Sequence, residues 1–306
     1  MINRGLIRLK VVQLMYAYYQ NEGASLQKAL KELDNSLMDA YKLYCYMLLI
    51  IPEVTDFARD VYETACEQAR TLGRRELPSS KFVDNRLAAA LEENEDLRKF
   101  SENRKNHQWS EVAEEIRSLY KKIIGTEEYQ TYINSAENSM EEDRSLWMAL
   151  YRKCIQDNEE LEDFLEQWSI YWNDDKPIVD TFVMKTLRNI DNEKGTGIMP
   201  AYDTDEDHQY ALQLFEDALL NRTEYENMIA RNTRNWDFKR LPLMDVVIMV
   251  IAIAEIMTIP KIDVKVSINE YLNLLKDYGD PKSVGYVNGI LDSVIDQMRK
   301  EGRIAK

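Results

Sequence analysis

Residues 243–259 read LMDVVIMVIAIAEIMTI, and Pro260 follows them. A helix that is hydrophobic on all sides is buried in a protein core or in a membrane. The uncharged part of this run begins at Val246, is cut by Glu255 and is closed by Pro260, so it is shorter than the roughly 18 residues that a membrane span needs. The sequence therefore predicts a buried core helix here and no membrane-spanning segment.

The rest of the chain also favours helices. Its 306 residues include only 10 Gly and 7 Pro, and the long stretches without either residue disfavour a sandwich or barrel with many turns. Apolar residues recur at helical spacing in further segments, which are 1–20, 25–72, 86–91, 112–124, 145–155 and 161–172. We expect Pro52 to kink or break the second of them, and residues 73–80 (GRRELPSS) to form a loop. The predicted fold class is all-α.

The charge balance limits the kinds of partner. The chain carries 39 Lys and Arg against 54 Asp and Glu, a net charge of −15 with both His neutral. This balance excludes a protein that wraps nucleic acid as histones do, but it allows a local basic site. Most of the excess acid lies in residues 91–180. Two interpretations of this stretch stay open: a solvated surface, or a face that repels RNA while the ends of the chain accept it.

Residue types that carry catalysis or hold metals are sparse. The strings HExxH, GxSxG and the P-loop are absent, and two His cannot build a three-His metal site. Cys45, Cys66 and Cys154 lie far apart with no CxxC, which disfavours a disulfide framework or a zinc site and is typical of a reducing cytoplasm. The acidic segment 203–207 begins like a calcium loop, but His208 stands where that loop needs Gly. We expect no catalysis, no metal and no cofactor.

Four strings at the two ends of the chain point to a family. The C-terminal ones are WDFKRL at 236–241, KVSINE at 265–270 and YVNGILD at 286–292, and the N-terminal one is VQLMY at 12–16, preceded by Arg4 and Arg8. In this order they closely resemble the NusB family of bacterial transcription antitermination factors. The resemblance divides the chain into three expected parts, which are an N-terminal helix at 1–21 that completes a NusB-like core, an acidic helical insertion at 22–204, and a NusB-like C-terminal domain at 205–306.

The resemblance carries expectations about fold and function. It implies an all-helical fold of two small bundles, here enlarged by the inserted helical region. It implies binding of the boxA element in leader RNA of ribosomal RNA operons, together with the small-subunit ribosomal protein NusE, and loading onto RNA polymerase with other Nus factors in the cytoplasm. The alternative is a protein–protein adaptor of the transcription machinery with little or no RNA contact of its own.

The resemblance and the residue chemistry together give candidate site residues. The candidates for RNA binding are Arg4, Arg8, Tyr16, Lys282, Ser283 and Tyr286, and the candidate for contact with the ribosomal protein is Asp245. Arg4 and Arg8 lie one helical turn apart with no acid nearby, so their guanidinium groups can grip phosphates or stack on unpaired bases, unless they are ordinary solvated arginines. Lys282 stands where some family members carry an acid, and a lysine there favours phosphate.

Other candidates have two interpretations. Tyr16 and Tyr286 match family positions near RNA, where a ring can stack on a base, but each equally fits a half-buried core tyrosine. Asp245 either contacts the ribosomal protein or favours the dipole of the helix that it begins. Gly5 and Leu6 occupy positions where the family often has Arg. This departure implies an RNA affinity that is lower, or that depends on the partner.

Overall fold

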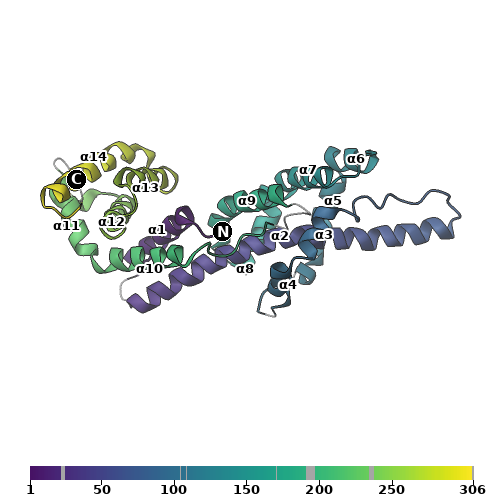
Figure 1. Cartoon of the computed structure of the whole chain (residues 1–306), viewed down its shortest axis with the longest axis horizontal. Helices are drawn as coiled ribbons and strands as arrows, with labels where there is room; N and C mark the ends of the chain where they lie inside the picture. The colour runs from purple at the N-terminus through teal and green to yellow at the C-terminus, as the bar shows by residue number, and fades with distance from the viewer. Residues whose placement is uncertain are drawn as a thin grey trace. The chain divides into compact units, whose positions relative to one another are not determined.

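The structure is a computed structural model that describes residues 1–21, 25–103, 105–107, 109–169, 171–190, 197–233 and 238–304. Within these ranges the chain folds into helices without a β-strand (Figure 1). They are α1 (Arg4–Gln20), α2 (Leu26–Thr71), α3 (Arg86–Glu92), α4 (Glu95–Glu102), η1 (Trp109–Glu111), α5 (Ala113–Ile124), α6 (Glu127–Asn134), α7 (Met140–Leu150), the π-helix η2 (Tyr151–Gln156), α8 (Glu159–Trp168), α9 (Trp172–Asn189), α10 (Asp205–Leu220), α11 (Arg222–Asn232), η3 (Phe238–Arg240), α12 (Leu243–Thr258), α13 (Val264–Tyr278), η4 (Pro281–Ser283) and α14 (Val284–Lys300). The all-α prediction is confirmed.

The chain forms two compact units. Unit 1 consists of Met1–Met38 and Ala201–Lys306, and unit 2 consists of Asp39–Pro200, so one division falls inside α2. The first turns of α2 thereby belong to unit 1, although they lie within the segment 22–204. The boundary at residue 22 and the Trp236-Asp237 start of the first family string lie outside the described residues. That segment 22–204 is an insertion stays a prediction.

Helix α12 is the centre of unit 1. Its side chains are buried from Asp245 to Ile256, and it packs against α1, α10, α11, α13 and α14. Full burial of one Val or Ile side chain contributes about 1.5–3 kcal/mol relative to exposure, so this helix is a major source of the unit's stability. No helix of the described residues is long and apolar enough to cross a membrane. The core helix predicted from residues 243–259 is confirmed.

The N-terminal residues of unit 1 fix the start of α1. The Asn3 side chain caps the helix by accepting the backbone N–H of Leu6 at 3.0 Å. The backbone N–H of Ile2 donates to the Ala201 carbonyl at 2.7 Å, and Ile2 forms an isolated parallel bridge with Tyr202. Because both ends of this short segment are held, Arg4 has a defined place in the first turn of α1.

Unit 2 is built around buried aromatic rings. Tyr46 on α2 has the rings of Phe100, Trp109, Trp168 and Trp172 around it, with centroid distances of 5.0–6.3 Å. Aromatic pairs at such distances contribute about 0.5–1.5 kcal/mol beyond their buried area. The aromatic side chains of the middle segment therefore serve mainly as packing anchors of this unit.

Pro52 does not break α2. The helix runs without interruption from Leu26 to Thr71, and Pro52 is buried within it. A proline in a helix interior removes one backbone hydrogen bond and crowds the preceding turn, at a cost of about 3 kcal/mol or more. Here the neighbouring Ile51 and Val54 are fully buried. Packing of this face compensates for the lost hydrogen bond, which a local sequence pattern cannot show.

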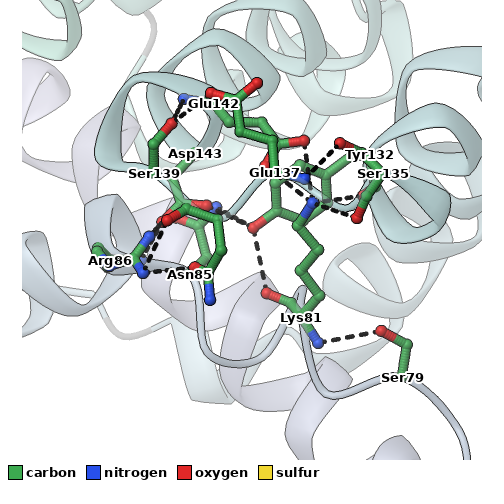
Figure 2. A network of polar contacts seen from close by, with 11 residues as sticks. Ser79, Lys81, Asn85, Arg86, Tyr132, Ser135, Glu137, Ser139, Glu142 and Asp143 are labelled. Atoms are coloured by element: carbon green, nitrogen blue, oxygen red, sulfur yellow. Dashed lines mark hydrogen bonds and ion pairs between the residues drawn. The ribbon is translucent and has the colours of Figure 1, made fainter.

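A polar network joins the loop after α2 to the rest of unit 2 (Figure 2). The Lys81 ammonium donates to the carbonyl oxygens of Tyr132 and Ser135, at 2.9 and 3.1 Å, and to the Glu142 carboxylate at 2.9 Å. Asp143, which is almost fully buried, accepts the Arg86 backbone N–H at 2.9 Å and the Tyr132 hydroxyl at 2.6 Å. The network therefore ties the end of the loop to α3, α6 and α7.

Candidate RNA-binding site

Arg4 lies in the first turn of α1 and keeps an exposed guanidinium. Its side chain is 43% exposed, its Nε lies 3.8 Å from Asp207 Oδ1, and its guanidinium carbon lies 5.5 Å from the ring centre of Tyr210. An exposed ion pair of this length contributes little to stability. Asp207 is therefore a weak competitor, and a phosphate can take its place at the guanidinium.

Arg8 is not at the surface. Its side chain is 6% exposed, and the guanidinium donates from Nε and from a terminal nitrogen to the two oxygens of Glu255, at 2.8 and 2.9 Å. A second carboxylate, that of Glu270, lies 3.5 Å away. The structure thus corrects the prediction that Arg8 contacts RNA, because a buried guanidinium that is paired with carboxylates is not accessible to a phosphate.

Glu255 is the acceptor at the centre of a buried cluster. Besides Arg8 it accepts the hydroxyls of Tyr210 at 2.6 Å, Tyr271 at 2.8 Å and Ser267 at 2.6 Å. Burial raises the pKa of the Glu255 carboxyl, but the hydrogen bond and charge of Arg8 outweigh it, so that the pKa lies below its ordinary value. The carboxylate stays ionised, and its hydrogen bonds connect α1, α10 and α13 to α12.

This cluster predicts a dependence of stability on pH. The pKa of the Glu255 carboxyl is lower in the folded state than in the unfolded state, so its ionised form stabilises the folded protein. This stabilisation is complete above about pH 4–5, the range in which an unfolded glutamate titrates. It is lost as the pH falls through the pKa of the folded state. We expect the free energy of unfolding of the Glu255→Gln variant to fall less steeply between about pH 5 and pH 3 than that of the wild type. Urea titrations across this range measure it, and parallel curves would contradict the assignment.

Tyr16 lies near the end of α1 away from Arg4. It is half-buried, and its hydroxyl accepts the Gln20 side-chain amide at 3.3 Å. The rise of 1.5 Å per residue places Tyr16 about 18 Å along the helix from Arg4. Both interpretations of this ring stay open, because one part of it packs in unit 1 and another part is accessible.

The short helix η4 carries two candidate RNA-binding residues, and only one of them is exposed to solvent. Lys282 is exposed, and its ammonium has no polar partner among the described residues, whereas its backbone N–H donates to the Asp280 side chain at 2.9 Å. Ser283 is 3% exposed, and its hydroxyl donates to the Asp280 carbonyl at 2.8 Å. The structure corrects the prediction for Ser283, because its hydroxyl is used to form the turn.

Tyr286 and Asp245 contact one another. The Tyr286 hydroxyl donates to the Asp245 carboxylate, and Asp245 is fully buried in the first turn of α12. Burial raises the pKa of Asp245, and the hydrogen bond from Tyr286 opposes this effect. Of the two interpretations of Asp245, its burial favours the structural one and corrects the prediction of direct contact with a ribosomal protein. Tyr286 is half-buried.

The remaining candidates lie on elements that α13 connects. Helix α13 packs against α1, which carries Arg4 and Tyr16, and against η4 and α14, which carry Lys282 and Tyr286. The cluster around Glu255 was not predicted, although one signal in the sequence pointed to it. A lone carboxylate inside an apolar helix requires a buried cation, because an unpaired buried charge is strongly unfavourable.

Comparison with known proteins extends the resemblance found in the sequence. The NusB family model matches residues 178–296. Three proteins named "Transcription antitermination protein NusB" are similar to parts of the chain. The one from Natranaerobius thermophilus is 36% identical over 93 residues, covering 30% of this chain and 67% of that protein. The one from Salinibacter ruber is 28% identical over 132 residues, covering 40% and 82%.

The third, from Chloroherpeton thalassium, is 32% identical over 97 residues, which are 32% of this chain and 46% of that protein, so the chain spans about half of its length. No solved structure matches the chain. The family match includes most of α9, α10 to α13 and most of α14, and thus the buried α12 and most of the helices that pack on it. The fold, the ordered strings and these matches agree, and the chain belongs to the NusB family.

Proposed function

We propose that this protein is a transcription antitermination factor that binds boxA-type leader RNA together with the ribosomal protein NusE. The observation that carries the proposal is family membership over α10 to α14, combined with exposed cations at Arg4 and Lys282 on unit 1. Its relatives are named for transcription antitermination. The proposed RNA-contacting residues are Arg4, Lys282, Tyr16 and Tyr286.

The chemistry of these residues suits single-stranded RNA. A guanidinium and an ammonium neutralise phosphates, and tyrosine rings stack on unpaired bases. Arg8, Ser283 and Asp245 are left out because each is buried. They support the site by holding α1, η4 and the start of α12 in place.

The double variant Arg4→Gln/Lys282→Gln tests this proposal. We expect weaker binding of a boxA-type RNA and a log–log dependence on salt that is shallower by about 1.4, since each phosphate contact on a single strand is worth about 0.7 in slope. Fluorescence anisotropy titrations at two salt concentrations, with and without NusE, measure both quantities.

Its matched control is Arg231→Gln/Lys300→Gln, which removes two exposed cations at the ends of α11 and α14. This control has the same net charge as the test variant. An equal loss in both variants would show that only the overall charge acts, and an unchanged slope in the test variant would contradict the proposed contacts.

The second candidate function is a protein–protein adaptor with little RNA contact of its own. The burial of Arg8, and of Leu6 where the family often has Arg, favours it because the N-terminal helix then offers few cations. In this case the titration without NusE gives no binding, and the titration with NusE gives the same slope for the wild type and for Arg4→Gln/Lys282→Gln.

We also propose that segment 22–204 is an insertion into a NusB-like core. The family strings lie on both sides of it, and unit 1 joins residues from both sides, as in the contact of Arg8 with Glu255. Its surface then serves contacts that a shorter chain does not make.

A further inference from the structure

The C-terminal end of α2 carries three arginines within six residues. Arg70, Arg74 and Arg75 are all exposed, and none has an ion pair or side-chain hydrogen bond with a described residue. Elsewhere in unit 2, Arg59, Arg86 and Arg144 pair with Asp56, Asp143 and Glu141, respectively. Other exposed arginines of this unit that lack such a partner are scattered along the chain rather than clustered within six residues. We call Arg70, Arg74 and Arg75 the arginine turn.

The backbone gives the arginine turn a defined shape. Gly73 adopts a φ of 64°, its N–H donates to the Arg70 carbonyl at 3.0 Å, and the Arg74 N–H donates to the Ala69 carbonyl at 2.9 Å. These two bonds form a Schellman motif, in which a left-handed residue, here glycine, ends the helix. An apolar residue often follows that glycine and packs back on the helix, whereas Arg74 stands there and is exposed. The motif therefore presents Arg70 and Arg74 on either side of one turn.

The loop that leaves the turn is held at its far end. Residues 74–80 have no helix or strand, and Lys81 is fixed by the carbonyls of Tyr132 and Ser135 and by Glu142 (Figure 2). The loop is thus anchored at both ends, and binding a ligand along it orders few residues, which limits the entropic cost.

Two exposed leucines flank the arginines. Leu72 is 67% exposed and Leu77 is 46% exposed. Leu72 lies between Arg70 and Arg74, and Leu77 follows Arg75. Apolar side chains beside cations fit a ligand that carries both negative charges and flat apolar faces. Single-stranded RNA has this pattern, because each nucleotide carries one phosphate and one unpaired base.

We propose that the arginine turn is a second contact for single-stranded RNA, outside the boxA-type element. With the neighbouring Glu67 and Glu76 counted, the turn keeps a net charge of +1, on a unit whose residues 91–180 are strongly acidic. A polyanion is therefore attracted to the three guanidinium groups and repelled from the acidic surface. The choice of RNA among polyanions rests on the proposed function. The contact is to phosphates, so it does not depend on base sequence.

The test uses the full chain and two RNAs: a short boxA-type RNA, and the same RNA extended on both sides by uridines. The variant is Arg70→Gln/Arg74→Gln/Arg75→Gln. The matched control is Arg98→Gln/Arg117→Gln/Arg152→Gln, which removes three arginines of unit 2 that are equally exposed and lack a carboxylate partner among the described residues. Both variants lose the same charge, and far-UV circular dichroism verifies that both keep their helices.

We expect the wild type to bind the extended RNA more tightly than the short one, and the arginine-turn variant to lose this gain. Three phosphate contacts at about 0.7 each make the salt slope shallower by about 2, so raising the salt from about 50 to about 200 mM weakens wild-type binding of the extended RNA roughly 20-fold more than variant binding. The control variant and the short RNA show no such difference.

The outcomes separate this inference from the proposed function. If the short RNA does not bind the wild type in the presence of NusE, the proposed function fails. If it binds while the extended RNA gains nothing, or the two triple variants behave alike, the second contact is refuted. If poly-glutamate competes as well as a uridine polymer of equal charge, the turn is a site for acidic proteins and the RNA assignment is overturned.

Discussion

Glu255→Gln lowers the free energy of unfolding by about 3–5 kcal/mol, the range expected when one partner of a buried ion pair is removed. The carboxylate accepts two hydrogen bonds from Arg8 and one each from Tyr210, Tyr271 and Ser267. A glutamine cannot neutralise the Arg8 guanidinium, which stays buried without its carboxylate. Urea unfolding followed by far-UV circular dichroism measures the loss.

Glu270→Gln is the matched control for this variant. Glu270 also faces Arg8, at 3.5 Å, but its side chain is 45% exposed, so we expect a change within about 0.5 kcal/mol. The double replacement Arg8→Met/Glu255→Leu recovers part of the stability, because it removes both buried charges together. A loss below about 1 kcal/mol in Glu255→Gln would contradict the central role of the cluster.

Asp143→Asn has the corresponding effect in unit 2, with an expected loss of about 2–4 kcal/mol. The two oxygens of Asp143 each accept a hydrogen bond, but an asparagine has one oxygen and one NH₂ group. At least one donor therefore loses its acceptor, and each buried donor left unpaired costs about 1–3 kcal/mol. These donors are the Tyr132 hydroxyl and the Arg86 backbone N–H (Figure 2). The partly exposed Arg86 guanidinium adds less, since solvent screens it.

Tryptophan fluorescence is the measurement for this variant, because Trp147 is fully buried on the same helix as Asp143. The control is Glu141→Gln, which lies on α7 too but pairs with Arg144 at the surface, where its own side chain is 72% exposed. We expect its unfolding midpoint to match that of the wild type. Equal shifts in the two variants would rule out a specific contribution of Asp143.

The fold class could be predicted from residues 243–259 because an apolar helix has one physical solution, burial among other helices. The end of α2 followed from the loop predicted to begin at Gly73, whose role is local. The start of α1 did not, because the cap by Asn3 shortens a helix that was predicted from residue 1. Pro52 is the exception. A local rule expects a break there, and burial of the surrounding face overrides it.

The site was less predictable because its residues depend on distant partners. Arg8 has no acid near it in sequence, yet its partner Glu255 stands 247 positions later. Leu6, one turn before Lys10, is buried, and so is Lys10. A sequence window shows which face of α1 is charged but not which neighbour covers that face. Arg4 and Lys282 remain exposed, as a site for RNA requires.

The ion pair between Arg8 and Glu255 also affects the order in which the chain folds. The ribosome makes α1 first and α12 only after the whole of unit 2 has emerged. Domains generally fold as they leave the ribosome, so unit 2 has time to collapse while the first helix still lacks its partners. The apolar side of α1 must therefore be kept from aggregating until α12 has been made.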